Sequence, residues 1–163
     1  VIGPGEAGAA QGSRAERVEA VRALLRAARF ATLSTISVKP AGHPYGSLVP
    51  LASGPKGEPV FLASELAQHT KNLAADPRAC LLVLAPDAQD PQQAPRASLL
   101  GTARRLAGPE ADAAKAPFLA AHPDAEGLLA MDFGLWALAV SEVRFVGGFA
   151  QAAWLSGSDL LAP

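Results

Sequence analysis

Residues 59–83 constrain the fold more than any other part of the chain, because their pattern changes twice. A β-rich run at 59–64 gives way to a short polar helix pattern at 65–75, and an Asp-Pro-Arg turn then leads into a continuous apolar run at 79–85. An uncharged run of that length is typical of a buried strand. The segment therefore predicts a strand, a polar helix and a second strand, and we expect any chemistry of this chain to lie there.

The remaining patterns add strands that are joined mostly by short turns. KPAG separates two β-rich runs and favours a tight reversal between paired strands, and Gly101 marks a bulge or a close approach of a neighbouring strand. Parallel sheets need a crossover after most strands, which this sequence does not supply. We therefore expect a mainly β fold with helices (α+β), in which six or seven strands form a closed or nearly closed antiparallel barrel. The other predicted elements are a helix at 13–28, strands at 30–37, 43–52, 96–106, 135–146 and 149–155, a helix at 109–121 and a short turn at 125–131.

The length and composition indicate a single domain, and its charges are too evenly balanced to attract a polyanion. The chain has 163 residues, 50% of them hydrophobic, and 14 Lys and Arg against 15 Asp and Glu leave a formal net charge of −1. We therefore expect no nucleic acid partner and no anionic membrane partner. The expected divisions are a disordered N-terminal segment at 1–12, one domain at 13–157 and a C-terminal tail at 158–163.

Other compositional features favour a cytoplasmic protein without a metal site. No apolar run approaches the roughly 18 residues of a membrane span, and the first residues have neither the basic start nor the apolar segment of a secretion signal. The single cysteine, Cys80, lies in an apolar run and is interpreted as a buried packing group, with a reactive thiol as the alternative. The histidines have no short ligand spacing with Cys or acidic residues, so no metal site is expected.

Four stretches in the right order resemble a known superfamily. They are GHPYGSLVPLA at 42–52, ASELAQHTKNLAADPRACLLV at 63–83, FLAAHPDA at 118–125 and VSEVRFVGGFAQAAWL at 140–155. Together they resemble the pyridoxamine 5′-phosphate oxidase superfamily of FMN-binding split barrels, and most of all its haem-utilisation (HugZ-like) branch. The resemblance covers about 17–155 and implies a split barrel that forms a homodimer and holds FMN or haem, a tetrapyrrole, in a cleft between subunits.

Several functions follow from this resemblance. The first is a flavin- or haem-binding oxidoreductase, in which the cofactor supplies the redox chemistry and the protein supplies orientation. A haem-degrading oxygenase is the second, and it would need an axial iron ligand. The third, of a different class, is a non-catalytic module that binds a tetrapyrrole or regulates a tetrapyrrole enzyme.

The departures from the superfamily pattern affect two sites. Ser47 stands where the oxidases carry a phosphate-binding arginine, Ala52 stands where they carry a lysine, and residues 67–69 read Ala-Gln-His in place of Ser-Arg-Lys. These changes remove the strongest partners of an FMN phosphate. Phe118 and His122 replace the tyrosine and arginine that hold the vitamin phosphate, so we expect no pyridoxamine phosphate oxidase activity.

The resemblance places the candidate cofactor residues on two elements. The strand at 43–52 runs along the flavin ring and offers its backbone groups, while the hydroxyl of Ser64 and the following helix N-terminus offer an anion site. Lys71 and Thr70 would partly replace the missing cations. The candidate cofactor-binding residues are Ser47, Val49, Pro50, Ser64, His69, Thr70, Lys71 and Asn72.

His69 is the most specific of these candidates. It is predicted to contact a phosphate or propionate, or to bind haem iron. The structural alternatives are that the imidazole of His69 satisfies a backbone carbonyl, that Ser64 is an ordinary helix N-cap, and that Lys71 and Asn72 lie on a solvated helix face with Leu66 turned inward.

Overall fold

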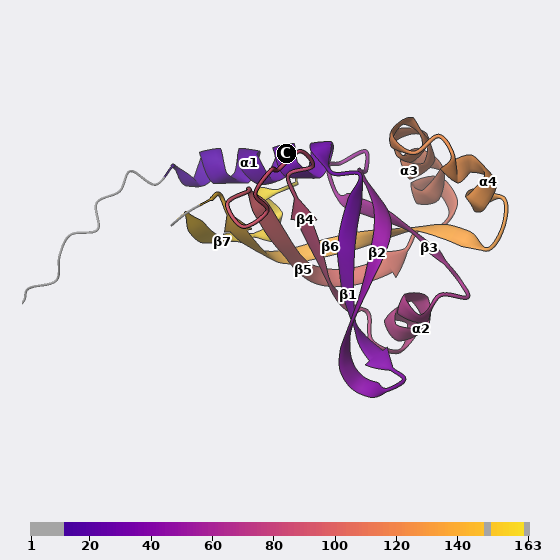
Figure 1. Ribbon diagram of the computed structural model, residues 1–163. Helices are drawn as coiled ribbons and strands as arrows, with labels where there is room; N and C mark the ends of the chain where they lie inside the picture. The colour runs from indigo at the N-terminus through magenta and orange to yellow at the C-terminus, as the bar shows by residue number, and fades with distance from the viewer. Residues whose placement is uncertain (1–11, 149–150, 162–163) are drawn as a thin grey trace, which may run out of the picture.

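A computed structural model describes residues 12–148 and 151–161 of the chain as a β-barrel with helices around it (Figure 1). The strands of this described part form one sheet in the order β3-β2-β1-β4-β5-β6-β7, and β3 also pairs with β6. That last pairing closes six strands into a barrel and leaves β7 outside, paired only with β6. The strands are β1 (Phe30–Val38), β2 (Ala41–Ser53), β3 (Pro59–Ser64), β4 (Arg78–Leu84), β5 (Arg96–Arg105), β6 (Phe133–Val146) and β7 (Ala152–Ser156). All pairings are antiparallel, which confirms the predicted fold class.

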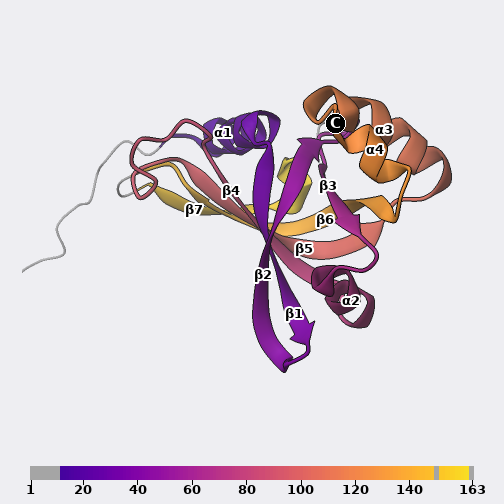
Figure 2. The ribbon, with the colours of Figure 1, turned by 45° about the vertical axis from the view of Figure 1, so that its right-hand side comes forward.

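The helices lie at the ends and side of the barrel. Figures 1 and 2 show α1 across the upper end, α3 and α4 together at one side, and α2 below, next to the projecting β1–β2 hairpin. They are α1 (Arg14–Ala27), α2 (Gln68–Ala75), α3 (Gly108–Ala121), α4 (Ala125–Leu129) and one 3-10 turn, η1 (Gly157–Asp159). Within the ranges described, no helix is both long enough and apolar enough to cross a membrane.

The barrel interior is filled by the inward side chains of alternating strand positions. In β1 every second residue from Ala31 is buried, as expected when one strand face meets the core. Each large apolar side chain enclosed in this way contributes about 1.5–3 kcal/mol. The largest fully buried side chains include Leu33, Leu51, Phe61, Leu81 and Leu99 in the barrel, and Phe118, which anchors α3 against β3 and β6.

A bulge interrupts the pairing of β5 with β6, as the sequence predicts. The register shifts between Leu100 and Gly101. A Cβ atom at residue 101 would overlap the carbonyl oxygen of Ala139. Only glycine lets the two backbones approach this closely.

The predicted helix at 65–75 is wrong at its N-terminal end. The helix begins at Gln68, with Ala67 as its N-cap, so Ser64 is not the N-cap. Leu66, predicted to face inward, is 76% exposed, whereas Asn72, predicted to face solvent, is 0% exposed. The reason is that residues 64–67 form a separate turn, which changes the face that α2 presents to the barrel.

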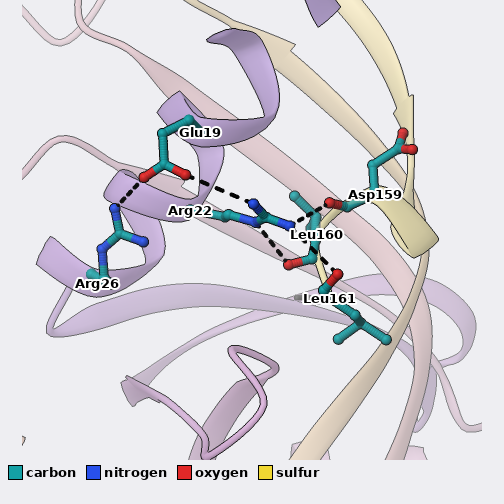
Figure 3. Close-up of polar contacts among 6 residues, drawn as sticks. All are labelled: Glu19, Arg22, Arg26, Asp159, Leu160 and Leu161. Atoms are coloured by element: carbon teal, nitrogen blue, oxygen red, sulfur yellow. Dashed lines mark hydrogen bonds and ion pairs between the residues drawn. The ribbon is translucent and has the colours of Figure 1, made fainter. Parts of the chain in front are cut away.

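Arg22 of α1 holds the C-terminal turn through its backbone carbonyls (Figure 3). The Arg22 guanidinium donates to the carbonyl oxygens of Asp159 at 2.9 Å, Leu160 at 3.1 Å and Leu161 at 3.4 Å. Asp159 also pairs with Arg14 at 2.5 Å. The start of α1 and the 3-10 turn η1 are therefore neighbours. The predicted segment at 1–12 and the predicted start of a strand at 149 fall almost entirely outside the described residues.

Candidate functional site

Strand β2 offers a backbone edge that β3 covers only in part. The Leu51 N–H donates to the Arg29 carbonyl at 2.9 Å, on the β1 side of the strand. The Gly54 N–H donates to the backbone carbonyl of Glu58 at 2.7 Å, on the opposite side. Backbone groups alternate direction along a strand, so those of Gly46 and Leu48 point to the same side as those of Gly54. Because β3 pairs only with residues 51–53, this part of the β2 edge has no strand beside it.

The predicted β2 residues differ in what they can offer a ligand. Val49 is 1% exposed, so its side chain belongs to the core. Ser47 is half-buried and its hydroxyl donates to the Leu33 carbonyl at 3.5 Å. Pro50 is partly exposed on the outer side of the barrel and lines a hollow there.

The polar groups of the β3–α2 turn are bonded to one another. The Ser64 hydroxyl makes a short hydrogen bond to the Asp132 carboxylate and accepts from the Leu66 N–H at 3.1 Å. The Glu65 N–H donates to the Asp132 carbonyl at 2.9 Å. The Thr70 hydroxyl donates to the Ser64 carbonyl at 2.6 Å. The structure therefore brings Ser64 and Thr70 together, with their hydroxyls already engaged.

The next turn of α2 combines a structural amide with an unsatisfied imidazole. The Asn72 side chain accepts from the Val38 N–H at 3.1 Å and donates to the Thr35 hydroxyl at 3.0 Å, which ties α2 to β1. His69 has its Nε2 atom buried without a hydrogen-bond partner, and burial lowers the pKa of this imidazole. Lys71 is exposed. In the described ranges, no cluster of three His, Cys, Asp or Glu side chains is suited to a metal ion.

This turn does not fit an FMN phosphate. The hydroxyl of Ser64 is bonded to a carboxylate, and Arg105 is ion-paired with Glu65. A dianion placed here would meet the charge of Asp132 and find the neighbouring donors in use.

A second candidate surface lies on the outer side of β1 and β2 and was not predicted, apart from Pro50. Phe30 is 54% exposed and Leu48 is 71% exposed. Phe30 borders two hollows, one of about 400 Å³ with Pro50 and His122, and one of about 320 Å³ with Leu48 and Leu82. We call this region, with Arg29 at its edge, the Phe30 surface.

The polar residues of the Phe30 surface are Arg29, Thr32, His122 and Asp124. The His122 Nε2–H donates to the Leu51 carbonyl at 2.8 Å, and its ring meets those of Phe30 and Phe118 at 5.7 and 4.9 Å. Arg29 lines the larger hollow and has no hydrogen-bond or ion-pair partner for its side chain in the part of the chain that is described. The sequence does contain a signal for this surface, because Phe30 and Leu48 are large apolar residues on two strands that were predicted to pair. Showing that both side chains face outward requires the register between β1 and β2, which the sequence does not give.

Comparisons with known proteins agree on the fold, and two of the relatives are named for haem. The family described as "CREG, beta-barrel" matches residues 12–161. The chloroplastic heme oxygenase HOZ of Arabidopsis thaliana is 37% identical over 123 residues, which cover 76% of this chain and 38% of that protein. A heme-binding protein from Mycobacterium smegmatis is 34% identical with a TM-score of 0.79, over 93% of this chain and 61% of that one.

A more distant structure bears on the fold alone. A Clostridium acetobutylicum protein of the pyridoxinephosphate oxidase family has a TM-score of 0.65 at 11% identity, over 91% of this chain and 99% of that one. This likeness confirms the split barrel. The chain spans less than two thirds of the two relatives that are named for haem, 38% and 61% of their lengths. Neither of these names mentions a flavin, so the flavin part of the sequence-based prediction is not supported.

Proposed function

Since this chain belongs to the CREG β-barrel family, we propose that it binds haem, or a closely related planar tetrapyrrole, at the Phe30 surface. The support from relatives is that the proteins 37% and 34% identical to it are named for a heme oxygenase and for heme binding. The single observation that carries the site is Phe30, an aromatic ring 54% exposed between two hollows.

The Phe30 surface has the composition that a porphyrin needs. Flat conjugated ligands gain most from apolar and aromatic contacts with a few fixed polar groups. Phe30, Leu48 and Leu82 supply the apolar contacts, and the Arg29 guanidinium is placed to bind a propionate carboxylate. Bound haem would supply a redox-active iron, while this chain would orient the ring and exclude water from it.

The residues predicted on α2 define an alternative position. Asn72 binds Thr35 and Val38 near the far end of β1, whereas Phe30 begins that strand, so one haem ring would not reach both places. Of the α2 residues, His69 and Lys71 retain groups for a ligand. A loss of haem binding in His69→Ala but not in Phe30→Ala would move the site to α2 and the adjacent β2 edge.

The test of this proposal is a haem titration followed by the Soret band. We expect wild-type protein to retain haem through gel filtration. Phe30→Ala and Arg29→Gln should each weaken haem binding by about tenfold. The first substitution removes an aromatic contact, and the second removes one charge-assisted hydrogen bond. Met131→Ala and Lys115→Gln are matched controls, because these side chains are exposed and lie outside both hollows. Equal binding by wild type and both variants would contradict the proposed site.

Haem degradation is a second candidate function, favoured by the 37% identity to the chloroplastic heme oxygenase. It would be tested by adding a reductant to the haem complex in air. Loss of the Soret band with release of a linear tetrapyrrole would indicate an enzyme, whereas a stable band would favour the non-catalytic binding or regulatory module.

We also propose that the chain forms a homodimer through its outer sheet face, with the tetrapyrrole held between copies. The registers place Leu48, Thr32, Leu82, Ser98, Arg144 and Trp154 opposite one another in a row across β2, β1, β4, β5, β6 and β7. Side chains that are directly opposite lie on the same face. Exposed apolar residues of this kind, such as Leu48 and Trp154 at 71% and 57%, support burial against a second copy.

A further inference from the structure

An acidic side chain from another part of the chain contacts the β3–α2 turn. Asp132, in the connection between α4 and β6, lies 68 residues from Ser64 in sequence, yet its carboxylate makes a short hydrogen bond with the Ser64 hydroxyl. Its backbone carbonyl accepts from Glu65 N–H at 2.9 Å. Asp132 therefore binds this turn through both its side chain and its main chain.

The donors that an anion would use at the turn are already engaged. The Leu66 N–H donates to the Ser64 hydroxyl at 3.1 Å, and the Ala67 N–H donates to the Ser64 carbonyl at 3.2 Å. The Arg105 guanidinium is paired with the Glu65 carboxylate. A phosphate would have to displace Asp132 and would still lack a free guanidinium there.

We infer that Asp132 is a specificity-determining residue that makes this split barrel reject phosphorylated cofactors such as FMN. The carboxylate takes the place of a ligand anion on Ser64, and its negative charge repels a phosphate dianion. This inference is independent of the haem proposal, because it concerns the phosphate group and not the ring.

The experiment compares riboflavin with FMN, two ligands that differ by one phosphate, in equilibrium dialysis. For the wild type we expect FMN to bind no more tightly than riboflavin. Asp132→Asn removes the charge and keeps the shape, so the affinity for FMN relative to riboflavin should rise by about tenfold. Asp132→Ser is a second variant, in case the first does not fold, and thermal denaturation checks both.

Asp112→Asn is the matched control, because it removes the same charge from an exposed carboxylate on α3 that lines neither hollow. Its ratio of FMN to riboflavin affinity should equal that of the wild type. Tighter FMN than riboflavin binding by the wild type would overturn the inference. The absence of any rise in the ratio, including no measurable FMN binding in folded Asp132 variants, would overturn it as well. Failure of the haem proposal would instead appear as no Soret band in the wild type.

Discussion

At the scale of single residues, His69 has an environment that favours its neutral form. Its Nε2 atom is buried without a partner, and desolvation lowers the pKa of the imidazole from 6.5. A neutral imidazole keeps one ring nitrogen without a proton, which is the form that binds metal and accepts hydrogen bonds.

The lowered pKa of His69 predicts a pH-dependent stability. The unfolded chain binds a proton to this histidine at a higher pH than the folded chain does, so the folded state loses stability as pH falls below 6.5. We expect His69→Gln to reduce the fall in Tm between pH 7.5 and pH 5.5, as measured by thermal denaturation. His43→Gln, at an exposed hairpin position, should leave the fall unchanged. A His69 variant with the same pH dependence as the wild type would contradict this account.

The candidate residues show which structural properties can be predicted from the local sequence around a residue and which cannot. Cys80 is only half-buried, on the face of β4 opposite to the core-facing Ala79 and Leu81, so it is not the buried packing group that was predicted, although burial raises the pKa of its thiol. The partner of Ser64 is an aspartate 68 positions away, and no local pattern indicates it. The ligand roles of the eight predicted residues stay predictions, although Val49 and Asn72 could act only through backbone groups, because their side chains are enclosed.

At the scale of elements, strand prediction succeeded where local chemistry decides the structure. The third strand was predicted at 59–64 and is Pro59–Ser64, since Pro and Gly turns bound it on one side and a polar segment on the other. The prediction of which face of α2 is buried was wrong. That face is fixed by contacts of α2 and the preceding turn with Asp132, Thr35 and Val38, and all three residues lie outside the helix.

Replacing Gly101 at the β5–β6 bulge by alanine should change the stability of the protein differently from the same replacement of Gly127 in α4. Gly101→Ala should lower the free energy of unfolding by more than about 2 kcal/mol, because its Cβ would overlap Ala139 backbone. Gly127→Ala, in α4 with nothing within 4 Å of the added Cβ, should be neutral or raise it by up to about 1 kcal/mol. Urea denaturation measures both. Equal effects of the two substitutions would mean that the close approach of β5 and β6 is not rigid.

At the scale of the whole molecule, the outer sheet face predicts a concentration-dependent dimer. Leu48→Arg would place a charge in the centre of the proposed interface, where its burial is costly. We expect sedimentation velocity to show a dimer for wild type at micromolar concentration and a monomer for Leu48→Arg. Leu66→Arg is the control, since Leu66 is 76% exposed in the β3–α2 turn. A monomeric wild type at 100 µM would contradict the proposal.

The outer face also shows what the sequence could not predict about the site. The strands and their approximate bounds along the chain followed from the patterns, but the row from Leu48 to Trp154 depends on five pair registers that no single strand specifies. The Phe30 surface was therefore missed, even though Pro50 at its edge was among the predicted residues.

The bonding of Arg22 and Arg14 to the C-terminal turn has a consequence for protein engineering. Because Arg14 and Asp159 touch, a short glycine linker from residue 161 to residue 12 would close the chain into a ring. Reopening that ring in the exposed loop at 87–92 should give a circular permutant that retains the barrel. Far-UV circular dichroism and Tm would test it, and a permutant that fails to fold would show that an intact 87–92 loop is needed for the barrel to form. Any partner fused to either end of this domain would start from the same corner of the barrel, beside α1.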